Sequence, residues 1–92
     1  MAGVVRLADL SAGLDATSTP NIQASTDVFV NNKGVHRTGD AWTPHGVPLH
    51  GRVTVGGSPN VYVNGKKVAR IGDLISCGDI AGQGSTNVFC NG

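Results

Sequence analysis

Three histidines and one cysteine are the residues of this sequence that could together bind a metal ion: His36, His45, His50 and Cys77. Three imidazoles and a thiolate suit a tetrahedral zinc ion, with Zn–N distances of about 2.0–2.1 Å and a Zn–S distance of about 2.3 Å. Sulfur combined with nitrogen favours zinc over magnesium or calcium, and iron stays open as the alternative metal. Each residue also has an ordinary interpretation, because a single histidine is commonly a polar surface or core residue and Cys77 could be a small buried side chain.

A phrase that recurs along the chain indicates how these side chains could meet. STDVFVNNKGVHRTGD at 25–40 aligns without a gap with SPNVYVNGKKVARIGD at 58–73, at a spacing of about 33 residues, which is typical of repeat proteins. Residues 85–92, STNVFCNG, begin the phrase again without its second half. That second half stands at the start of the chain, where VVRLAD at 4–9 matches the VHRTGD and VARIGD of the two complete copies.

Each complete copy has the pattern of a β-hairpin followed by a turn. Around 61–63, valines alternate with other side chains, which is the period of a half-buried strand. Asn64-Gly65 follows, and this pair predicts a type I′ turn, in which both central residues need φ > 0. In the first copy we expect Asn31-Asn32, followed by Gly34, to form the bend.

The split copies at the two ends of the chain predict a third hairpin. Pairing a strand near 86–91 with a strand near 3–7 would complete it. We therefore expect an all-β fold of three β-hairpin arms with pseudo-threefold symmetry, in which the N- and C-terminal strands are paired. Such closure also removes exposed strand edges. The alternative is three hairpins in an open sheet or sandwich, with the repeat as a trace of duplication.

The repeat also places the metal-binding candidates. His36 occupies the slot that Val5 and Ala69 hold in the other copies, so it should face inward. His45 and Cys77 follow the Gly-Asp of their copies at nearly the same distance, so their loops should meet near the axis.

The remaining ligand and two neighbouring residues follow from the same alignment. The corresponding loop of the first arm, at Gly13-Leu14, offers no ligand, so His50 would supply the fourth group. Trp42 should pack over the site, and Cys90, aligned with valines, should be a small core residue.

Composition limits the classes of function. A chain of 92 residues has room for one domain with a thin core, and it contains only two phenylalanines, one tyrosine and one tryptophan. The net charge is +1 and the basic residues are scattered, which argues against nucleic-acid binding. The N-terminal MAGVVRLADLSAG lacks the pattern of a signal peptide, and no apolar stretch approaches the roughly 20 residues that span a membrane. Synthesis in the cytoplasm is therefore expected. Cys77 and Cys90 should be two free thiols, and a disulfide between them is the alternative.

The recurring phrase resembles that of PAAR-repeat proteins. The shared pattern is S-P-N-V-[FY]-V-N-G-K-x-x-A-R-x-G-D, and it covers nearly the whole chain. The Pro-Ala-Ala-Arg that names the family appears here only in degenerate form, as KVAR at 67–70, GVHR at 34–37 and GVVR at 3–6, each without the proline. The stretch GVHRTGDAWTPHG is similar to the versions found in contractile phage tails and related injection systems.

The resemblance implies a small β-rich cone whose apex is held by a metal on three histidines and one cysteine, here His36, His45, His50 and Cys77. Such proteins cap and sharpen the trimeric β-helical spike of a phage tail or type VI secretion tube, one copy per trimer. The chain would then be a structural tip protein made in the bacterial cytoplasm, which touches the target membrane transiently as the spike pierces it. We expect a single domain over 1–92 without a cargo domain, and neither a nucleic acid nor a small molecule as substrate. The spike-contacting residues stay unassigned, and so does the choice among phage tail, bacteriocin-like tail and secretion system.

Two other functions compete with this interpretation. A zinc hydrolase needs an open coordination position, whereas four protein ligands close the site. The chain also contains no glutamate to act as a base, and Asp40 and Asp73 recur with the repeat, which indicates an architectural role. A stand-alone zinc-containing module that binds a cell-surface sugar is the second rival, and the shortage of aromatic platforms argues against it.

Overall fold

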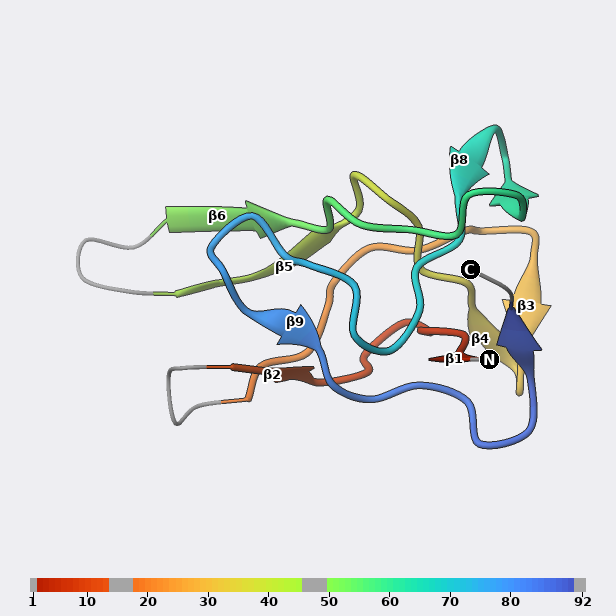
Figure 1. Cartoon of the computed structure of the whole chain (residues 1–92), viewed down its shortest axis with the longest axis horizontal. Helices are drawn as coiled ribbons and strands as arrows, with labels where there is room; N and C mark the ends of the chain where they lie inside the picture. The colour runs from red at the N-terminus through yellow and green to blue at the C-terminus, as the bar shows by residue number, and fades with distance from the viewer. Residues whose placement is uncertain (1, 14–17, 46–49, 91–92) are drawn as a thin grey trace.

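Short antiparallel strands build the whole fold. The structure is a computed structural model that describes residues 2–13, 18–45 and 50–90 (Figure 1). Within these ranges ten strands pair into five two-stranded antiparallel ladders, and the fold is all-β, as expected. The strands are β1 (Ala2–Gly3), β2 (Ser11–Ala12), β3 (Phe29–Val30), β4 (Lys33–Gly34), β5 (Ala41–His45), β6 (His50–Val53), β7 (Tyr62–Val63), β8 (Lys66–Lys67), β9 (Ile80–Ala81) and β10 (Phe89–Cys90). In these same ranges no helix is long and apolar enough to cross a membrane.

Three of the ladders gather at one end of the molecule, which we call the base. They are β3–β4, β7–β8 and β1–β10, and Figure 1 shows them on the right. Asn31 and Asn32 have φ of 54° and 65°, and Asn64 and Gly65 have φ of 55° and 77°, so both predicted type I′ turns are confirmed. Gly34 was expected at the bend, but it lies in β4. A Cβ there would sit 2.3 Å from the carbonyl oxygen of Ser25, so the close approach of two backbones requires the glycine.

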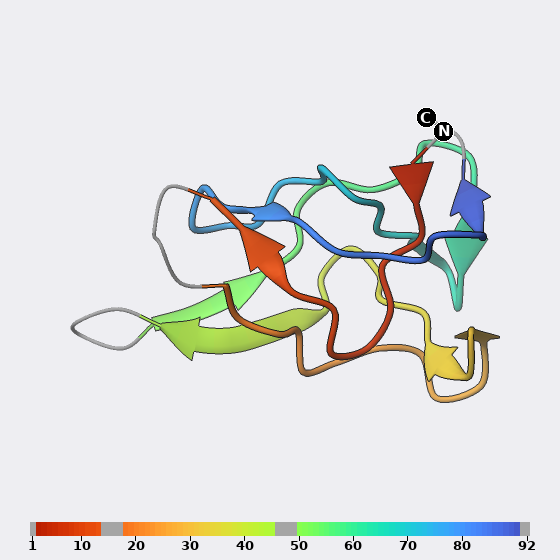
Figure 2. The same cartoon turned by 90° about the horizontal axis from the view of Figure 1, so that it is seen from below.

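The third hairpin joins the two ends of the chain. β1 pairs with β10 so that Ala2 faces Cys90 and Gly3 faces Phe89. The Val4 amide extends the ladder by donating to the carbonyl of Val88 at 3.0 Å. β1, the first strand, and β10, the last, lie at the same end of the molecule in Figure 2. The predicted pairing of the terminal strands is therefore confirmed.

A ring of three backbone hydrogen bonds closes the arms around one axis. The amide of Val5 donates to the carbonyl of Ala69, that of Ala69 to His36, and that of His36 to Val5, each at 3.0 Å. These residues hold the same slot in the three copies of the phrase. A cycle that returns to its first residue requires three strands around a common axis, whereas an open sheet would leave its two ends unpaired. The pseudo-threefold arrangement is thus observed, and the open-sheet alternative is wrong.

The Arg and Asp of each copy form a clasp that ends the arm. Arg6, Arg37 and Arg70 each bind the aspartate three residues later, with closest ion-pair distances of 2.9, 2.8 and 2.8 Å. The amide of each arginine donates to the same carboxylate, so the clasp also fixes the backbone turn. The three aspartates, Asp9, Asp40 and Asp73, are almost fully buried. Their recurrence in the sequence therefore reflects architecture, as expected.

The core consists of two thin layers of small side chains along the axis. The layer nearer the base contains Val4, Val35, Val68 and Cys90, with Val30 and Val63 packed against it. The second layer contains Val5, Trp42, Ala69, Ile75 and Ala81, and Cys77 packs at its edge. Beyond it, the β5–β6 and β2–β9 ladders extend away from the base (Figure 1). We call this the apical end of a body that measures 34 × 23 × 22 Å.

Candidate functional sites: a basal valine cup and an apical donor cluster

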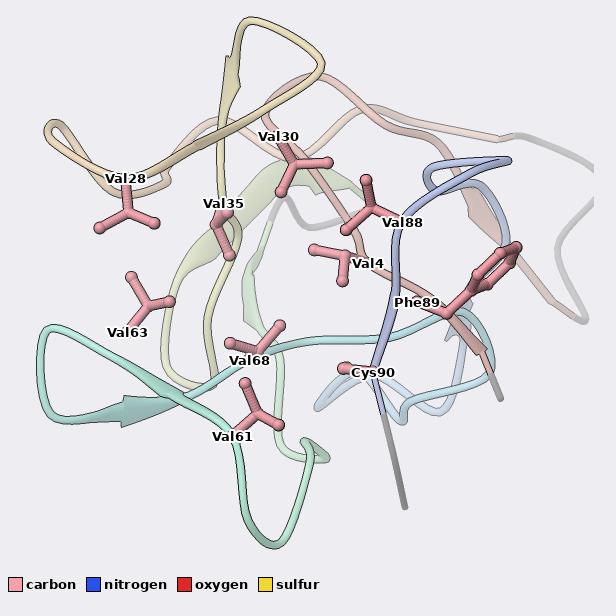
Figure 3. Close-up of a pocket in the computed structure, with 10 residues that line it drawn as sticks. All are labelled: Val4, Val28, Val30, Val35, Val61, Val63, Val68, Val88, Phe89 and Cys90. Carbon is pink, nitrogen blue, oxygen red and sulfur yellow. The ribbon is translucent and has the colours of Figure 1, made fainter.

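The base is hollowed by an apolar cavity of about 190 Å³ that follows the repeat (Figure 3). Its lining consists of three sets of equivalent residues, together with Phe89. The sets are Val4, Val35 and Val68; Val30, Val63 and Cys90; and Val28, Val61 and Val88. We call this cavity the valine cup. Because each set takes one residue from each arm, the cup repeats the same side chains around the axis.

Exposure divides the valine cup into a floor and a rim. Val4, Val35 and Val68 are 5%, 2% and 2% exposed, so they form the floor. The rim residues Val28, Val61 and Val88 are 37%, 36% and 37% exposed. Three side chains in nearly identical environments show that the symmetry extends from the sequence to the surface.

Aromatic and basic side chains surround the cup. Phe29, Tyr62 and Phe89 occupy one position of the repeat and are about half exposed. Contiguous exposed apolar surface of this kind marks an interaction site. Lys33 and Lys66 are exposed at equivalent positions of two hairpins, where the third has Ala2, and Lys67 adds a further exposed charge. The base is therefore apolar at its centre and carries exposed lysines on two of its three hairpins.

Asparagines at the hairpin turns tie neighbouring arms together and so hold the cup in shape. The amide group of Asn64 donates to Asp27 at 3.0 Å, and its oxygen accepts from Arg37 at 3.0 Å. Asn31, the equivalent residue, donates to Asn87 at 3.0 Å. The hydrogen bond from Asn64 lowers the pKa of Asp27, so this carboxylate stays ionised and keeps its acceptor role.

His36 lies fully buried in the core, as predicted, and both ring nitrogens have partners. Nδ1 lies 2.7 Å from the carbonyl oxygen of Gln23, which can only accept, so Nδ1 carries the proton. Nε2 therefore accepts from the hydroxyl of Thr54 at 2.7 Å, and that hydroxyl accepts from Trp42 Nε1–H at 2.7 Å. The rings of His36 and Trp42 meet edge to face at 5.2 Å. Burial lowers the pKa of His36, which keeps the imidazole neutral.

The other three predicted ligands lie toward the apical end. The backbones of His45 and His50 pair directly across β5 and β6, and their side chains lie outside the described residues. Cys77 is a half-buried free thiol whose Sγ accepts a hydrogen bond from Arg52 Nη1 at 3.7 Å. Among the side chains that the structure describes, no group of three or more His, Cys, Asp or Glu is placed to hold a metal ion. The four-ligand site stays a prediction, and His36 could join it only by exchanging its bond to Thr54.

Arg52 is a central residue of the apical end that the sequence analysis did not identify. It lies in β6, its side chain is fully buried, and its Nη1 pairs with Asp79 Oδ2 at 3.2 Å. It also binds the carbonyl of Thr43 through Nε and Nη2, at 3.1 and 2.9 Å, and the hydroxyl of Thr19 through Nη2. One signal could have found it: six of the seven basic residues belong to the repeated phrase, and Arg52 is the exception.

Comparison with known proteins agrees with this architecture. No curated protein matches the chain. The family profile of the PAAR motif matches it twice, over residues 15–83 and 50–92. The two matches overlap, as expected for a fold whose arms repeat one phrase around an axis, and together they extend over 15–92, most of the sequence. With three arms, terminal closure and the repeated Arg–Asp clasp all in place, the chain belongs to the PAAR-motif family, the spike-tip proteins of contractile injection systems.

Proposed function

We propose that this protein caps the end of a trimeric β-helical spike with its valine cup, one copy per trimer. The observation that carries the proposal is the threefold repetition of the cup lining, with three rim valines that are equally exposed. A single chain that presents the same surface three times around an axis can make equivalent contacts with three identical partner chains. A sandwich with one unique face could not.

The chemistry of the base indicates what the spike end should present. A cavity of about 150 Å³ accommodates benzene, so a cup of about 190 Å³ has room for an apolar group of similar or slightly larger size. Three aliphatic side chains that meet on the axis of the trimer would meet this requirement. The lysines around the cup favour acidic residues at the edge of the spike, because opposite charges steer and orient association.

The apical end would then point toward the target cell. We place the protein at the tip of a phage tail spike or type VI secretion tube, where it helps to pierce the envelope and touches the membrane transiently. A structural role suits the carboxylates: all five aspartates in the described ranges accept hydrogen bonds from other side chains.

One structural zinc ion at the apical end is part of the proposal. His45, His50 and Cys77 would hold it, and His36 would complete the set where it gives up the hydroxyl of Thr54. The support is the donor chemistry: a half-buried free thiol and the backbone pairing of His45 with His50 lie at the same end of the molecule. When bound, zinc would supply a closed, redox-inert cross-link.

Native mass measurement of the complex with the spike trimer tests the docking proposal. We expect one copy of this chain per three spike chains, and a 3:3 assembly would contradict it. Val61→Asp places a charge on the cup rim and should abolish the complex. Val55→Asp is the matched control, because Val55 is 53% exposed and does not line the cup. If the two variants bind equally well, the cup is not the docking surface.

A further inference from the structure

We propose that the buried guanidinium of Arg52 is the cross-link that holds the apical end together, so that the fold of this chain is stable without a metal ion. Three loops follow the three Arg–Asp clasps, and they cover residues 10–24, 41–57 and 74–84. Arg52 belongs to the second loop, where it binds the carbonyl of Thr43. It reaches the first loop through Thr19 and the third through Asp79 and Cys77. One side chain therefore joins all three loops.

The guanidinium is completely satisfied in this position. An arginine carries five N–H donors in a rigid fork. Nε donates to Thr43, Nη1 to Asp79 and Cys77, and Nη2 to Thr43 and Thr19, which accounts for all five. The exposed fraction of the arginine side chain is 0%, and that of Asp79 is 8%. Disturbing a buried charge with this many partners strongly destabilises the fold, because removing one partner leaves the other charge uncompensated.

A second polar link joins the first two loops independently of Arg52. Gln23 of the first loop accepts from His36, and Thr54 and Trp42 of the second loop complete that network. Both links consist of protein groups alone. A core this thin commonly needs an additional staple such as a metal ion. The buried Arg52 cation supplies the cross-link. A zinc ion that binds Cys77 would add a further link between loops that protein groups already hold together.

Thermal unfolding of the full chain separates the two contributions. The protein is melted after dialysis against EDTA and again after one equivalent of zinc chloride is restored. We expect the EDTA-dialysed protein to unfold in one cooperative transition well above about 25 °C, and bound zinc to raise the melting temperature further by mass action. Arg52→Met should lower it by about 10 °C or more. Lys33→Met, which removes an exposed charge from the base, is the matched control and should change it by no more than about 2 °C.

Two milder variants keep the test decisive if Arg52→Met does not fold. Arg52→Lys keeps the positive charge but loses the fork, and Thr19→Val removes one partner from the first loop; each should lower the melting temperature by about 5 °C. The proposal is overturned if these variants melt like the wild type, or if the EDTA-dialysed protein shows no cooperative unfolding transition. Zinc content, measured on the same samples by elemental analysis, decides the zinc proposal separately. Arg52 can thus be the cross-link whether or not the ion binds.

Discussion

Ala8 holds a strained backbone position, and we predict that Ala8→Gly stabilises the protein. Ala8 has φ of 72°, in the left-handed region that residues with a Cβ rarely adopt. The equivalent residues of the other two arms are Gly39 and Gly72, with φ of 91° and 95°. All three lie in the turn between the Arg and the Asp of the clasp. Two arms therefore use the residue that the turn requires, and the first arm does not.

The expected magnitude is the difference of two opposing effects. The left-handed conformation costs an alanine about 1–2 kcal/mol. A glycine loses more backbone entropy on folding, which offsets about 0.5–1 kcal/mol of the gain. The net increase in the free energy of unfolding should be about 0.5–1 kcal/mol, or about 2–8 °C in melting temperature.

Gly72→Ala provides the reverse test of the same effect. A Cβ built at Gly72 has no neighbouring atom within 4 Å, so a loss of stability there reports backbone strain rather than a clash. We expect about 1 kcal/mol of destabilisation, measured by urea unfolding of both variants beside the wild type. If Ala8→Gly is destabilising, or if Gly72→Ala is neutral, the strain argument is wrong for this turn.

Three further predictions follow from single residues. The contribution of His36 to the free energy of unfolding should be fully present above about pH 6.5 and fall as the pH drops below that value, because burial lowers the pKa of His36 from 6.5 in the folded state only. His36→Asn should flatten this part of the profile of unfolding free energy against pH. An unchanged slope would assign it to other groups. Cys90→Val should change the free energy of unfolding by less than about 1 kcal/mol, because the other two arms carry valine there. In the wild type a thiol reagent should modify Cys77 before Cys90, since Cys90 is 6% exposed and burial raises the pKa of its thiol. Equal labelling rates would contradict this. Lys33→Glu should slow association with the spike at low salt and leave folding intact, because Lys33 is exposed on the base. Stopped-flow binding and a thermal melt would show this, and an association rate equal to that of the wild type would exclude electrostatic steering through this residue.

The three hairpins and their closure could be predicted because the information is local or repeated. Asn64-Gly65 sets its own turn through positive φ at two adjacent residues, and the same holds for Asn31-Asn32. The closure of β1 on β10 was predictable because each terminal strand lacks the partner that its copies have beside them in sequence. Gly34 was misplaced for a related reason. Its requirement comes from the approach of the Ser25 backbone, a contact that the local pattern does not contain.

The sequence by itself determined the repeat, the class of fold and the family, since these depend on residue type and spacing, and it predicted a set of metal ligands. The tertiary structure alone decided how side chains from different arms meet. It brought the valines of three arms around one cup, and it occupied both nitrogens of His36 with Gln23 and Thr54. It also placed Arg52 beside Thr19 and Asp79, which are far from it in the chain. Contacts of this kind arise between loops that share no repeat, so only the closed fold determines which polar groups face each other in the apical interior.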